Sequence, residues 1–441
     1  MKRPISMLGA ALVAGAALGA GGAWAQQVEQ YVPLLTYRTG PYAPSGIPAA
    51  NGMVDYFKLV NLRGGVNGVR LLVEECETGY DTARSVECYE RMKTKNGGAV
   101  LIQPWSTGAT FAISEKADAD KIPVLTLGYG RGDAANGKVF KWVFPLAGNY
   151  QLGEDVIVQA IGAREGGLDK LAGKKIAVAY HDSAYGKETL PLLRKRAAMH
   201  GFQLIEVPLT PPGLEQKSAW LQIRRDRPDY IILRGYGVMT PTALKEAQSI
   251  GFARNRIYGS WWAGSEADTR DLGDNAKGYN AVALQGSANY DAKVIKDILA
   301  QLYDKRQGTA GNRDEVGEVL YVRGLMAALF TVEAIRTAQE HFKKAGQRVT
   351  GEEVRWALEN LNITQQRIDE LGFNAILRPI RTSCADHMGS YVARISTWDG
   401  KRWGISSDWM EANRALVDEV DNESSARYAK EHNITPRTCN E

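Results

Sequence analysis

The chain alternates short apolar runs with amphipathic segments from residue 30 to about residue 285. The runs are rich in β-branched and aliphatic residues and recur roughly every 25 to 30 residues, which is typical of repeated βα units. They predict strands at Val69–Val73, Ala99–Ile102, Pro123–Leu127, Ile176–Tyr180, Leu204–Val207, Tyr230–Leu233 and Arg256–Gly259. Segments with helical spacing lie between them, at Thr82–Lys95, Thr110–Asp120, Lys187–His200, Ser218–Asp226 and Thr240–Ile250. This pattern predicts parallel sheets that helices cover on both faces.

The pattern changes after residue 285. Apolar residues at helical spacing predict a long helix over Val316–Ala338, and a second helix follows at Glu352–Leu361, where Thr350 could cap it. Tyr391–Trp398 and Arg402–Ile405 then flank an Asp-Gly pair, which is a strong hairpin signal. We therefore expect two α/β lobes whose chain crosses between them more than once.

Composition narrows the classes of protein to which the chain can belong. Of 441 residues, 44% are hydrophobic and 24% are charged, which is ordinary for a soluble globular protein and excludes a disordered chain, a collagen-like fibre and a multispanning membrane protein. The formal charge of +4 is small against 54 basic and 50 acidic residues, so nothing indicates nucleic acid as a partner.

Residues 1–25 have the three parts of a secretory signal peptide. Lys2 and Arg3 are basic, Met7–Ala23 is apolar, and Ala23-Trp24-Ala25 fits the small-x-small rule for cleavage before Gln26. The apolar run is short for a membrane-spanning helix. An uncleaved anchor is the alternative; we expect an exported protein located in the periplasm.

Four cysteines follow the leader: Cys76, Cys88, Cys384 and Cys439. An even number in an exported protein indicates disulfides, for which three connectivities are possible. Pairing of sequence neighbours is the simplest, and a bridge to Cys439 would tether the polar tail after Asn422, which otherwise has little reason to be ordered. A zinc site is the rival interpretation, but no closely spaced cysteine pair or nearby histidine supports it.

Signatures of catalysis and of nucleotide binding are largely absent. The sequence has no nucleophile elbow, zinc-protease helix or phosphate loop. The run from Gly128 to Gly132 is rich in glycine but lacks the spacing of a dinucleotide site. We expect neither a metal nor a cofactor.

Aromatic and hydroxyl residues gather where the predicted strands end. In open α/β sheets, ligands bind beyond the carboxyl ends of the strands. Each such residue taken alone is as well explained by a packed or exposed loop, but together they predict a shared small-molecule cleft. The candidate residues are Tyr42, Trp105, Ser106, Thr107, Gly128, Tyr129, Gly130, Tyr185, Tyr236, Trp261 and Trp262.

An ordered set of short motifs resembles a known family. The set runs through Thr39-Gly40-Pro41-Tyr42, Arg63-Gly64-Gly65-Val66-Asn67-Gly68, Asp81-Thr82-Ala83-Arg84, Gln103–Gly108, Lys121-Ile122-Pro123-Val124, Asp182-Ser183-Ala184-Tyr185-Gly186 and Pro228-Asp229-Tyr230. The chain is similar over nearly its whole mature length to the solute-binding proteins of ABC importers, in the leucine/isoleucine/valine-binding (type I) group. The resemblance implies two Rossmann-like lobes joined by three hinge crossovers, closing around a solute without catalysis. We expect lobe 1 to comprise residues 28–147 and 285–372, and lobe 2 residues 148–284 and 373–441.

The resemblance also assigns roles to residues. It implies that Ser106 and Thr107 bind the ligand carboxylate, that the loop from Gly128 to Gly130 faces the ligand's polar head, and that Tyr185 and Tyr236 close over it from the second lobe. Amino-acid binders carry an acidic residue just after the strand that ends near Gly259, where it pairs with the ligand ammonium. Here that region reads Ser260-Trp261-Trp262-Ala263.

This departure predicts a small carboxylate with an aromatic or otherwise apolar body and no α-ammonium group. Trp105, Trp261, Trp262 and Tyr236 would supply flat walls. Arg131 or Arg234 could add positive charge, and Asp182 or Glu266 could instead approach an amine. We expect a monomer that delivers its solute to an inner-membrane ABC permease. The alternatives are a branched-chain amino acid or amide binder, a ligand-sensing receptor module with the same fold, and a secreted enzyme.

Overall fold

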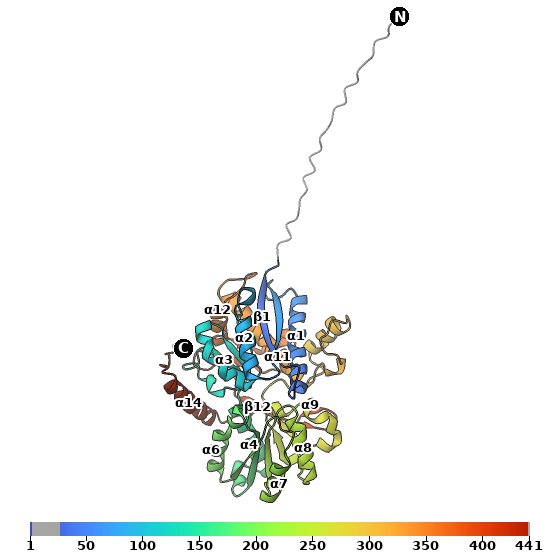
Figure 1. The fold of residues 1–441 in the computed structure, drawn as a ribbon, viewed down its shortest axis with the longest axis vertical. Coiled ribbons are helices and arrows are strands. Elements are labelled where there is room, and N and C mark those ends of the chain that lie inside the picture. Colours follow the sequence, from blue (N-terminus) through green and yellow to red (C-terminus); the bar gives the residue numbers. More distant parts are fainter. Residues whose placement is uncertain (2–26, 440–441) are drawn as a thin grey trace.

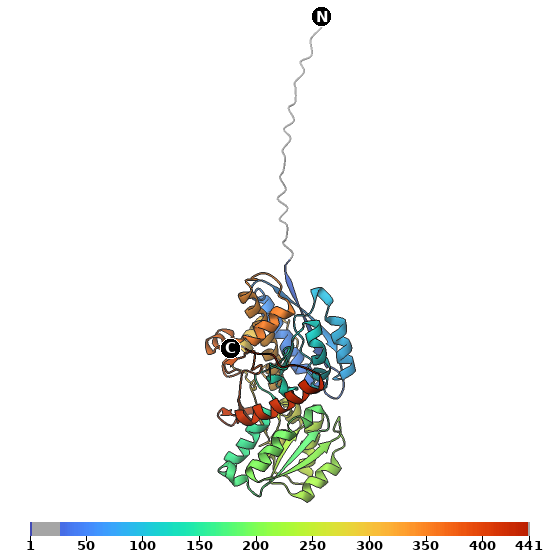
Figure 2. The same cartoon turned by 90° about the vertical axis from the view of Figure 1, so that its left-hand side faces the viewer.

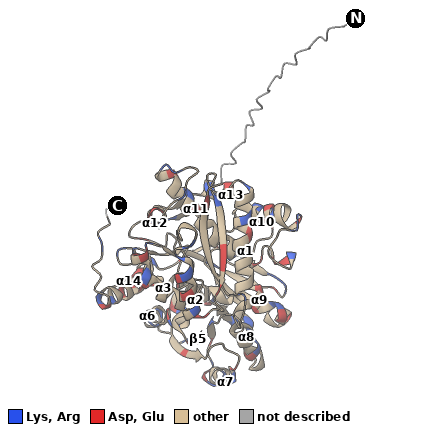
Figure 3. Cartoon of the chain, turned by 45° about the horizontal axis from the view of Figure 1, so that its top comes forward, with Lys and Arg blue, Asp and Glu red and all other residues tan. Residues whose placement is uncertain are grey.

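The computed structural model has two α/β lobes stacked along the long axis of the molecule (Figure 1). It describes Met1 and residues 27–439, so the predicted signal peptide lies almost entirely outside the described residues. Basic and acidic residues are interspersed over the helices (Figure 3). Within the described part of the chain, no helix is long and apolar enough to cross a membrane.

The first lobe is built on two pairs of parallel strands. Strand β1 (Glu29–Thr36) pairs with β2 (Arg70–Glu77), and β3 (Val124–Leu127) pairs with β4 (Val143–Leu146). The predicted strand at Ala99–Ile102 is reduced to a single bridge from Ile102 to Val124, because Gly97 and Gly98 before it and Pro104 after it limit the pairing. The covering helices are α1 (Ala43–Leu62), α2 (Thr82–Met92), α3 (Thr107–Asp120), α11 (Val319–His341), α12 (Gly351–Glu359) and α13 (Gln365–Leu371).

The second lobe contains an eight-stranded sheet in the order β13-β12-β9-β8-β7-β5-β6, with β14 paired to β12. Its parallel part is formed by β5 (Lys175–His181), β6 (Gln203–Leu209), β7 (Tyr230–Arg234), β8 (Ile257–Gly259) and β9 (Asn280–Ala283). Its antiparallel part is formed by β12 (Val392–Trp398), β13 (Trp403–Ile405) and β14 (Met410–Glu411). Helices of this lobe include α4 (Tyr150–Glu165), α5 (Ala184–Lys187), α6 (Leu190–His200), α7 (Lys217–Asp226), α8 (Met239–Ser249) and α9 (Glu266–Thr269), whereas α10 (Lys293–Ile298) follows the return to the first lobe and contacts α1. The doubly wound α/β architecture predicted from the apolar periodicity is confirmed.

The predicted hairpin forms where the sequence places it. Trp398 faces Trp403 across the two strands, and the Asp399 carboxylate accepts hydrogen bonds from the amides of Lys401 and Arg402 in the turn. The predicted capping of the second helix is also present, because Thr350 and Glu353 form a reciprocal capping box at the start of α12.

Helix α11 is the central element of the first lobe, and it packs directly on α1. Most of its residues are buried. The two helices approach closely at Gly52 and Gly324, where an added Cβ would lie 2.1 Å from the Tyr321 carbonyl oxygen and 2.0 Å from that of Ala49. This close contact fixes α11 beside the gap between the lobes and thereby positions the side chains that it directs toward the second lobe.

The chain crosses between the lobes after β4, after β9 and before β12. Strand β11 (Ile380–Arg381) still pairs with β10 (Asn362–Ile363), whereas β12 joins the large sheet. We therefore propose that lobe 1 extends beyond residue 372, as far as β11.

The C-terminal helix α14 (Arg414–Glu431) runs beside the junction of the two lobes (Figure 2). Lys195 of α6 forms ion pairs with Glu419 and Glu423 of this helix, while Tyr428 stacks on Phe140 of the first lobe. The expectation that the chain after Asn422 lacks a reason for order other than a disulfide is therefore wrong, since this helix continues to Glu431 and contacts both lobes.

Both predicted disulfides are present, Cys76–Cys88 and Cys384–Cys439. The second attaches the segment after α14 to the chain just after β11. Arg437 reinforces this attachment, since its amide donates to the Lys138 carbonyl oxygen and its side chain forms an ion pair with Glu359.

We expect removal of the Cys384–Cys439 bridge by serine substitution of both cysteines to cost more stability than removal of Cys76–Cys88. The bridges close loops with sequence separations of 55 and 12 residues. In the chain-entropy model this corresponds to about 4 and about 3 kcal/mol of unfolding free energy, respectively. Urea denaturation of the two double variants measures the difference, and a larger loss for the Cys76–Cys88 variant would contradict this ranking.

Candidate ligand-binding site

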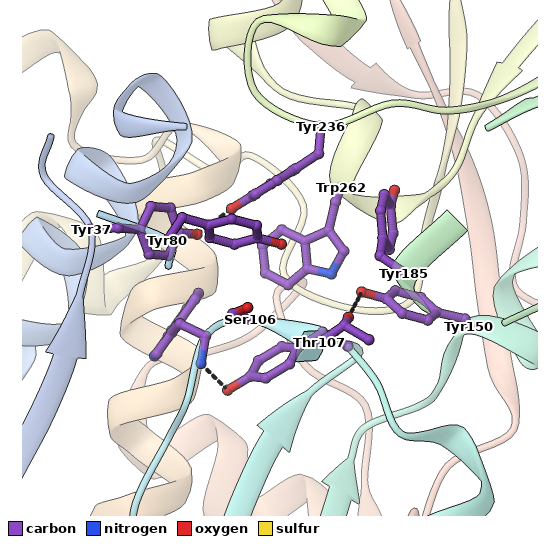
Figure 4. A pocket seen from close by; sticks show the side chains of 10 residues that line it. Tyr37, Tyr80, Ser106, Thr107, Tyr150, Tyr185, Tyr236 and Trp262 are labelled. Carbon is purple, nitrogen blue, oxygen red and sulfur yellow. Dashed lines mark hydrogen bonds between the residues drawn. The ribbon is translucent and has the colours of Figure 1, made fainter. Parts of the chain in front are cut away.

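A cavity lies between the two lobes and is lined almost entirely by aromatic rings (Figure 4). The space between its side chains, including the opening to solvent, is about 240 Å³. Only about 10 Å³ of it is open to the centre of a water-sized sphere, which is room for about one water molecule, so a larger solute requires the lining rings or the lobes to move apart. The lining residues are Tyr37, Tyr80, Trp105, Ser106, Thr107, Tyr129, Tyr150, Tyr185, Tyr236 and Trp262.

The N-terminus of α3 supplies hydrogen-bond donors to the cavity. Ser106 caps the helix, since its Oγ accepts from the Ala109 amide at 3.4 Å. The amides of Thr107 and Gly108 donate to no atom among the described residues. The Thr107 hydroxyl lies 3.3 Å from the Tyr150 hydroxyl. Free amides at a helix N-terminus, together with two hydroxyls, form a site suited to an anion.

Two tryptophans and a tyrosine form one wall of the cavity. The Trp105 amide donates to the Tyr129 hydroxyl at 2.9 Å, and the Trp262 ring nitrogen donates to the Gly128 carbonyl oxygen at 3.0 Å. The rings of Trp105, Tyr129 and Trp262 lie about 6 Å apart, centroid to centroid, within the range of edge-to-face and tilted aromatic pairs. Trp105 has φ +53°, a left-handed conformation that is costly for a large side chain and that the surrounding contacts must hold.

Contacts between the lobes close the cavity. The hydroxyls of Tyr37 and Tyr236 touch each other from opposite lobes. Farther out, the Tyr42 ring stacks on Tyr236 and its hydroxyl lies 2.9 Å from Nε2 of His181. Glu188 of the second lobe accepts a hydrogen bond from the Gly132 amide of the first lobe at 2.5 Å. The structure therefore represents a closed arrangement of the lobes.

Burial controls the charge of the groups around the cavity. It raises the pKa of the lining tyrosines, that of Tyr185 to about 12, so their hydroxyls are neutral donors at neutral pH. Burial lowers the pKa of His181 to about 4 and raises that of Glu188 to about 7. No charged side chain is among the lining residues of this cavity as the structure describes it.

The four charged residues proposed from the sequence do not line the cavity. Arg234 is fully buried behind Tyr150 and Tyr185 and forms an ion pair with Glu154. Arg131 pairs with Asp133 at 2.9 Å. Asp182 pairs with Lys187, and Glu266 accepts from the Val319 amide.

Seven of the eleven predicted site residues line the cavity: Trp105, Ser106, Thr107, Tyr129, Tyr185, Tyr236 and Trp262. The other four lie behind or beside it. Trp261 packs against Gly128, whose carbonyl oxygen holds Trp262; Gly130 lies against Thr107 and Glu188; and Tyr42 closes the outer edge.

Three lining residues are absent from the sequence-based set, namely Tyr37, Tyr80 and Tyr150. These residues could have been found by the strand-end rule, which expects ligand-facing side chains just after the carboxyl ends of the strands. Tyr37 follows β1 directly, Tyr80 follows the end of β2 by three residues, and Tyr150 begins the helix after β4.

Comparisons with known proteins agree with this architecture. A family model described as periplasmic binding protein matches residues 29–402. The chain is similar to a protein of the Pseudomonas fluorescens group described as an ABC transporter permease, with 42% identity, a TM-score of 0.86, and coverage of 93% of this chain and 99% of that one. A comparison with curated proteins found no match.

More distant solved structures share the fold. One is a branched-chain amino acid ABC transporter protein from Thermus thermophilus with bound valine, at 20% identity and a TM-score of 0.74, covering 89% of this chain and 99% of that one. Another is a solute-binding protein from Rhodopseudomonas palustris in complex with benzoate, at 16% identity and a TM-score of 0.66, covering 87% and 98%.

We expect Gly128→Ala to destabilise the protein by about 3 kcal/mol or more, through overpacking and backbone strain. Gly128 has φ +56°, and an added Cβ would lie 1.8 Å from the Trp261 ring. Gly251→Ala is the matched control, since Gly251 has φ +73° with nothing within 4 Å of the added Cβ. Strain alone should cost that control about 1 kcal/mol. Urea denaturation measures the free energy of unfolding of both variants. Equal losses would show that the packing of Trp261 does not depend on Gly128.

Proposed function

Because the chain belongs to the periplasmic binding protein family of ABC transporter substrate-binding proteins, we propose that its solute is a small carboxylate with an aromatic or otherwise apolar body. The protein would capture this solute between the lobes in the periplasm and deliver it, as a monomer, to an inner-membrane ABC permease. The observation that carries the proposal is a closed aromatic cavity that is rich in hydrogen-bond donors and has no charged side chain in its lining.

The donors favour a ligand that accepts hydrogen bonds. Ser106, Thr107 and the two free amides of α3 can donate toward the cavity, whereas the Tyr185 and Tyr129 hydroxyls already donate to backbone carbonyl oxygens. A buried carboxylate needs several such bonds to offset its desolvation, and charge-assisted hydrogen bonds are stronger than neutral ones. The positive end of the α3 dipole adds to this preference.

The lining offers no carboxylate partner to an α-ammonium group. Trp262, with Trp261 behind it, occupies the region where the family's amino-acid binders carry an acid, and Asp182 and Glu266 lie elsewhere. The fold alone does not decide the ligand, since distant relatives with this fold were solved with valine, benzoate and 4-hydroxybenzoate. The chemistry of this cavity resembles what an aromatic acid requires more than what valine requires.

The flat rings favour an apolar or aromatic ligand body. Trp105, Trp262 and Tyr236 are each about nine-tenths buried or more, and all three line the cavity, where they can contact a planar group. Aromatic pairs contribute about 0.5 to 1.5 kcal/mol beyond area burial. An amino acid or amide binder is the second candidate, because the same ring faces can attract an ammonium group.

We expect benzoate and cinnamate to quench or shift tryptophan fluorescence on binding, whereas leucine, isoleucine and valine give no response. Ser106→Ala should weaken acid binding about 10- to 100-fold, because a hydrogen bond to a charged group contributes about 1.5 to 3 kcal/mol. Ser114→Ala, on the same helix, is the control, since Ser114 donates only to the Thr110 carbonyl oxygen. Tight binding of the amino acids with no response to the acids would refute the ligand class.

We also expect saturating benzoate or cinnamate, whichever binds more tightly, to reduce the radius of gyration in small-angle X-ray scattering. The physical reason is that Tyr37–Tyr236, Tyr42–His181 and Glu188–Gly132 bridge the lobes in the closed arrangement, and a bound ligand adds contacts to both lobes. Leucine at the same concentration is the control. A radius that stays the same at saturation would count against closure by hinge motion.

A further inference from the structure

We infer that Arg323, buried behind the tryptophan wall formed by Trp261 and Trp262, makes the cavity select an anionic ligand over a neutral or cationic one of the same shape. Arg323 lies on α11, away from every strand end, and does not line the cavity. The inference rests on the proposed function and deepens it, because it assigns the charge selectivity to one residue outside the lining.

The guanidinium of Arg323 lies against the wall of the cavity. The side chain is 1% exposed, and Nη1 donates to the Trp261 carbonyl oxygen at 2.6 Å. The guanidinium carbon is 4.6 Å from the ring centroid of Trp261 and 5.2 Å from that of Trp262. Since Trp262 lines the cavity, the positive charge lies one aromatic ring behind the ligand space.

Arg323 has no ion-pair partner, a feature that it shares with Arg394 among the buried arginines of the described chain. Arg131, Arg196 and Arg234 each form an ion pair with a buried carboxylate. Among the described residues no ion pair involves Arg323, and its Nε has no hydrogen-bond partner. A buried charge without a partner is costly, so a compensating contact with the ligand would be favourable.

Arg323 keeps its charge under working conditions. Burial lowers its pKa to about 9, which still leaves the guanidinium protonated at neutral pH. Asp268 and Glu266 are the acids whose charge acts most strongly on Arg323, and burial raises the pKa of each to about 7. The guanidinium is the charged group that lies over the Trp261 and Trp262 rings.

This charge would also explain the rejection of an ammonium group by an aromatic cavity. Trp261 and Trp262 already contact a cation, so a second cation near them would meet electrostatic repulsion. A ligand anion stacked on the wall would lie about 8 to 10 Å from the guanidinium, and Coulomb's law at an effective dielectric constant of about 20 gives roughly a 15- to 30-fold gain in affinity at that distance. The opposing charge of Asp268 and Glu266 reduces this gain toward about tenfold.

The test compares ligands that differ only in charge. Calorimetric titrations would use benzoate with benzamide, and cinnamate with cinnamamide, on the mature protein and its Arg323→Gln and Arg323→Lys variants. Glutamine removes the charge and keeps a polar amide, and lysine keeps the charge. Arg336→Gln is the control, because Arg336 lies on the same helix and pairs with Glu333 and Glu340.

We expect Arg323→Gln to weaken acid binding about tenfold and to leave amide binding within about twofold, whereas Arg323→Lys retains most of the acid preference. Arg336→Gln should change neither. An equal loss for acid and amide, or an unchanged acid preference in Arg323→Gln, would overturn the role of Arg323. Binding of leucine but of neither acid by the unaltered protein would instead overturn the proposed function, before Arg323 comes into question.

Discussion

Strand direction is the constraint on which the cavity depends. In each lobe parallel strands end at one edge, and the two edges face each other across the gap. Seven of the eight aromatic rings in the lining follow the end of a β-strand within four residues. They are Tyr37 after β1, Tyr80 after β2, Tyr129 after β3, Tyr150 after β4, Tyr185 after β5, Tyr236 after β7 and Trp262 after β8.

This arrangement determines both what the cavity offers and what it excludes. Because loops from both lobes meet, the rings exclude water, and burial keeps the tyrosine hydroxyls neutral. Their donors and the free amides of α3 then face a space of low polarity, where hydrogen bonds to an anion are strong. Arg323 adds positive charge without placing a charged side chain in the lining. The lining therefore stays apolar while the cavity favours an anionic ligand.

The periphery of the cleft supports the same closed state. Helix α14 contacts both lobes, and Cys384–Cys439 attaches the segment after it to the chain just after β11. Any opening of the lobes must therefore bend or shift this helix against α6 or against Phe140.

The fold and most of the site could be predicted from the sequence, because the periodicity of apolar residues defines the strands and the strand-end rule locates Trp105, Tyr129, Tyr185, Tyr236 and Trp262. The same rule covers Tyr80, but only if β2 ends at Glu77 rather than at Val73. The last four residues of β2 are Glu74, Glu75, Cys76 and Glu77, and no apolar signal marks them as strand.

Other features depend on tertiary contacts that no local pattern reports. The polar sequence of α14 becomes ordered because Leu416, Val417 and Val420 bury against the core. Arg323 lies inside a helix, and only the packing of α11 on α1 brings it behind the tryptophan wall.

Mass spectrometry of the solute released from gently purified protein would identify the class of ligand directly. We expect a small acid with an aromatic or apolar body and no α-ammonium group, present at close to one molecule per chain. Recovery of a branched-chain amino acid at that stoichiometry would contradict it, because such a ligand needs an acidic partner that the lining residues described here do not provide.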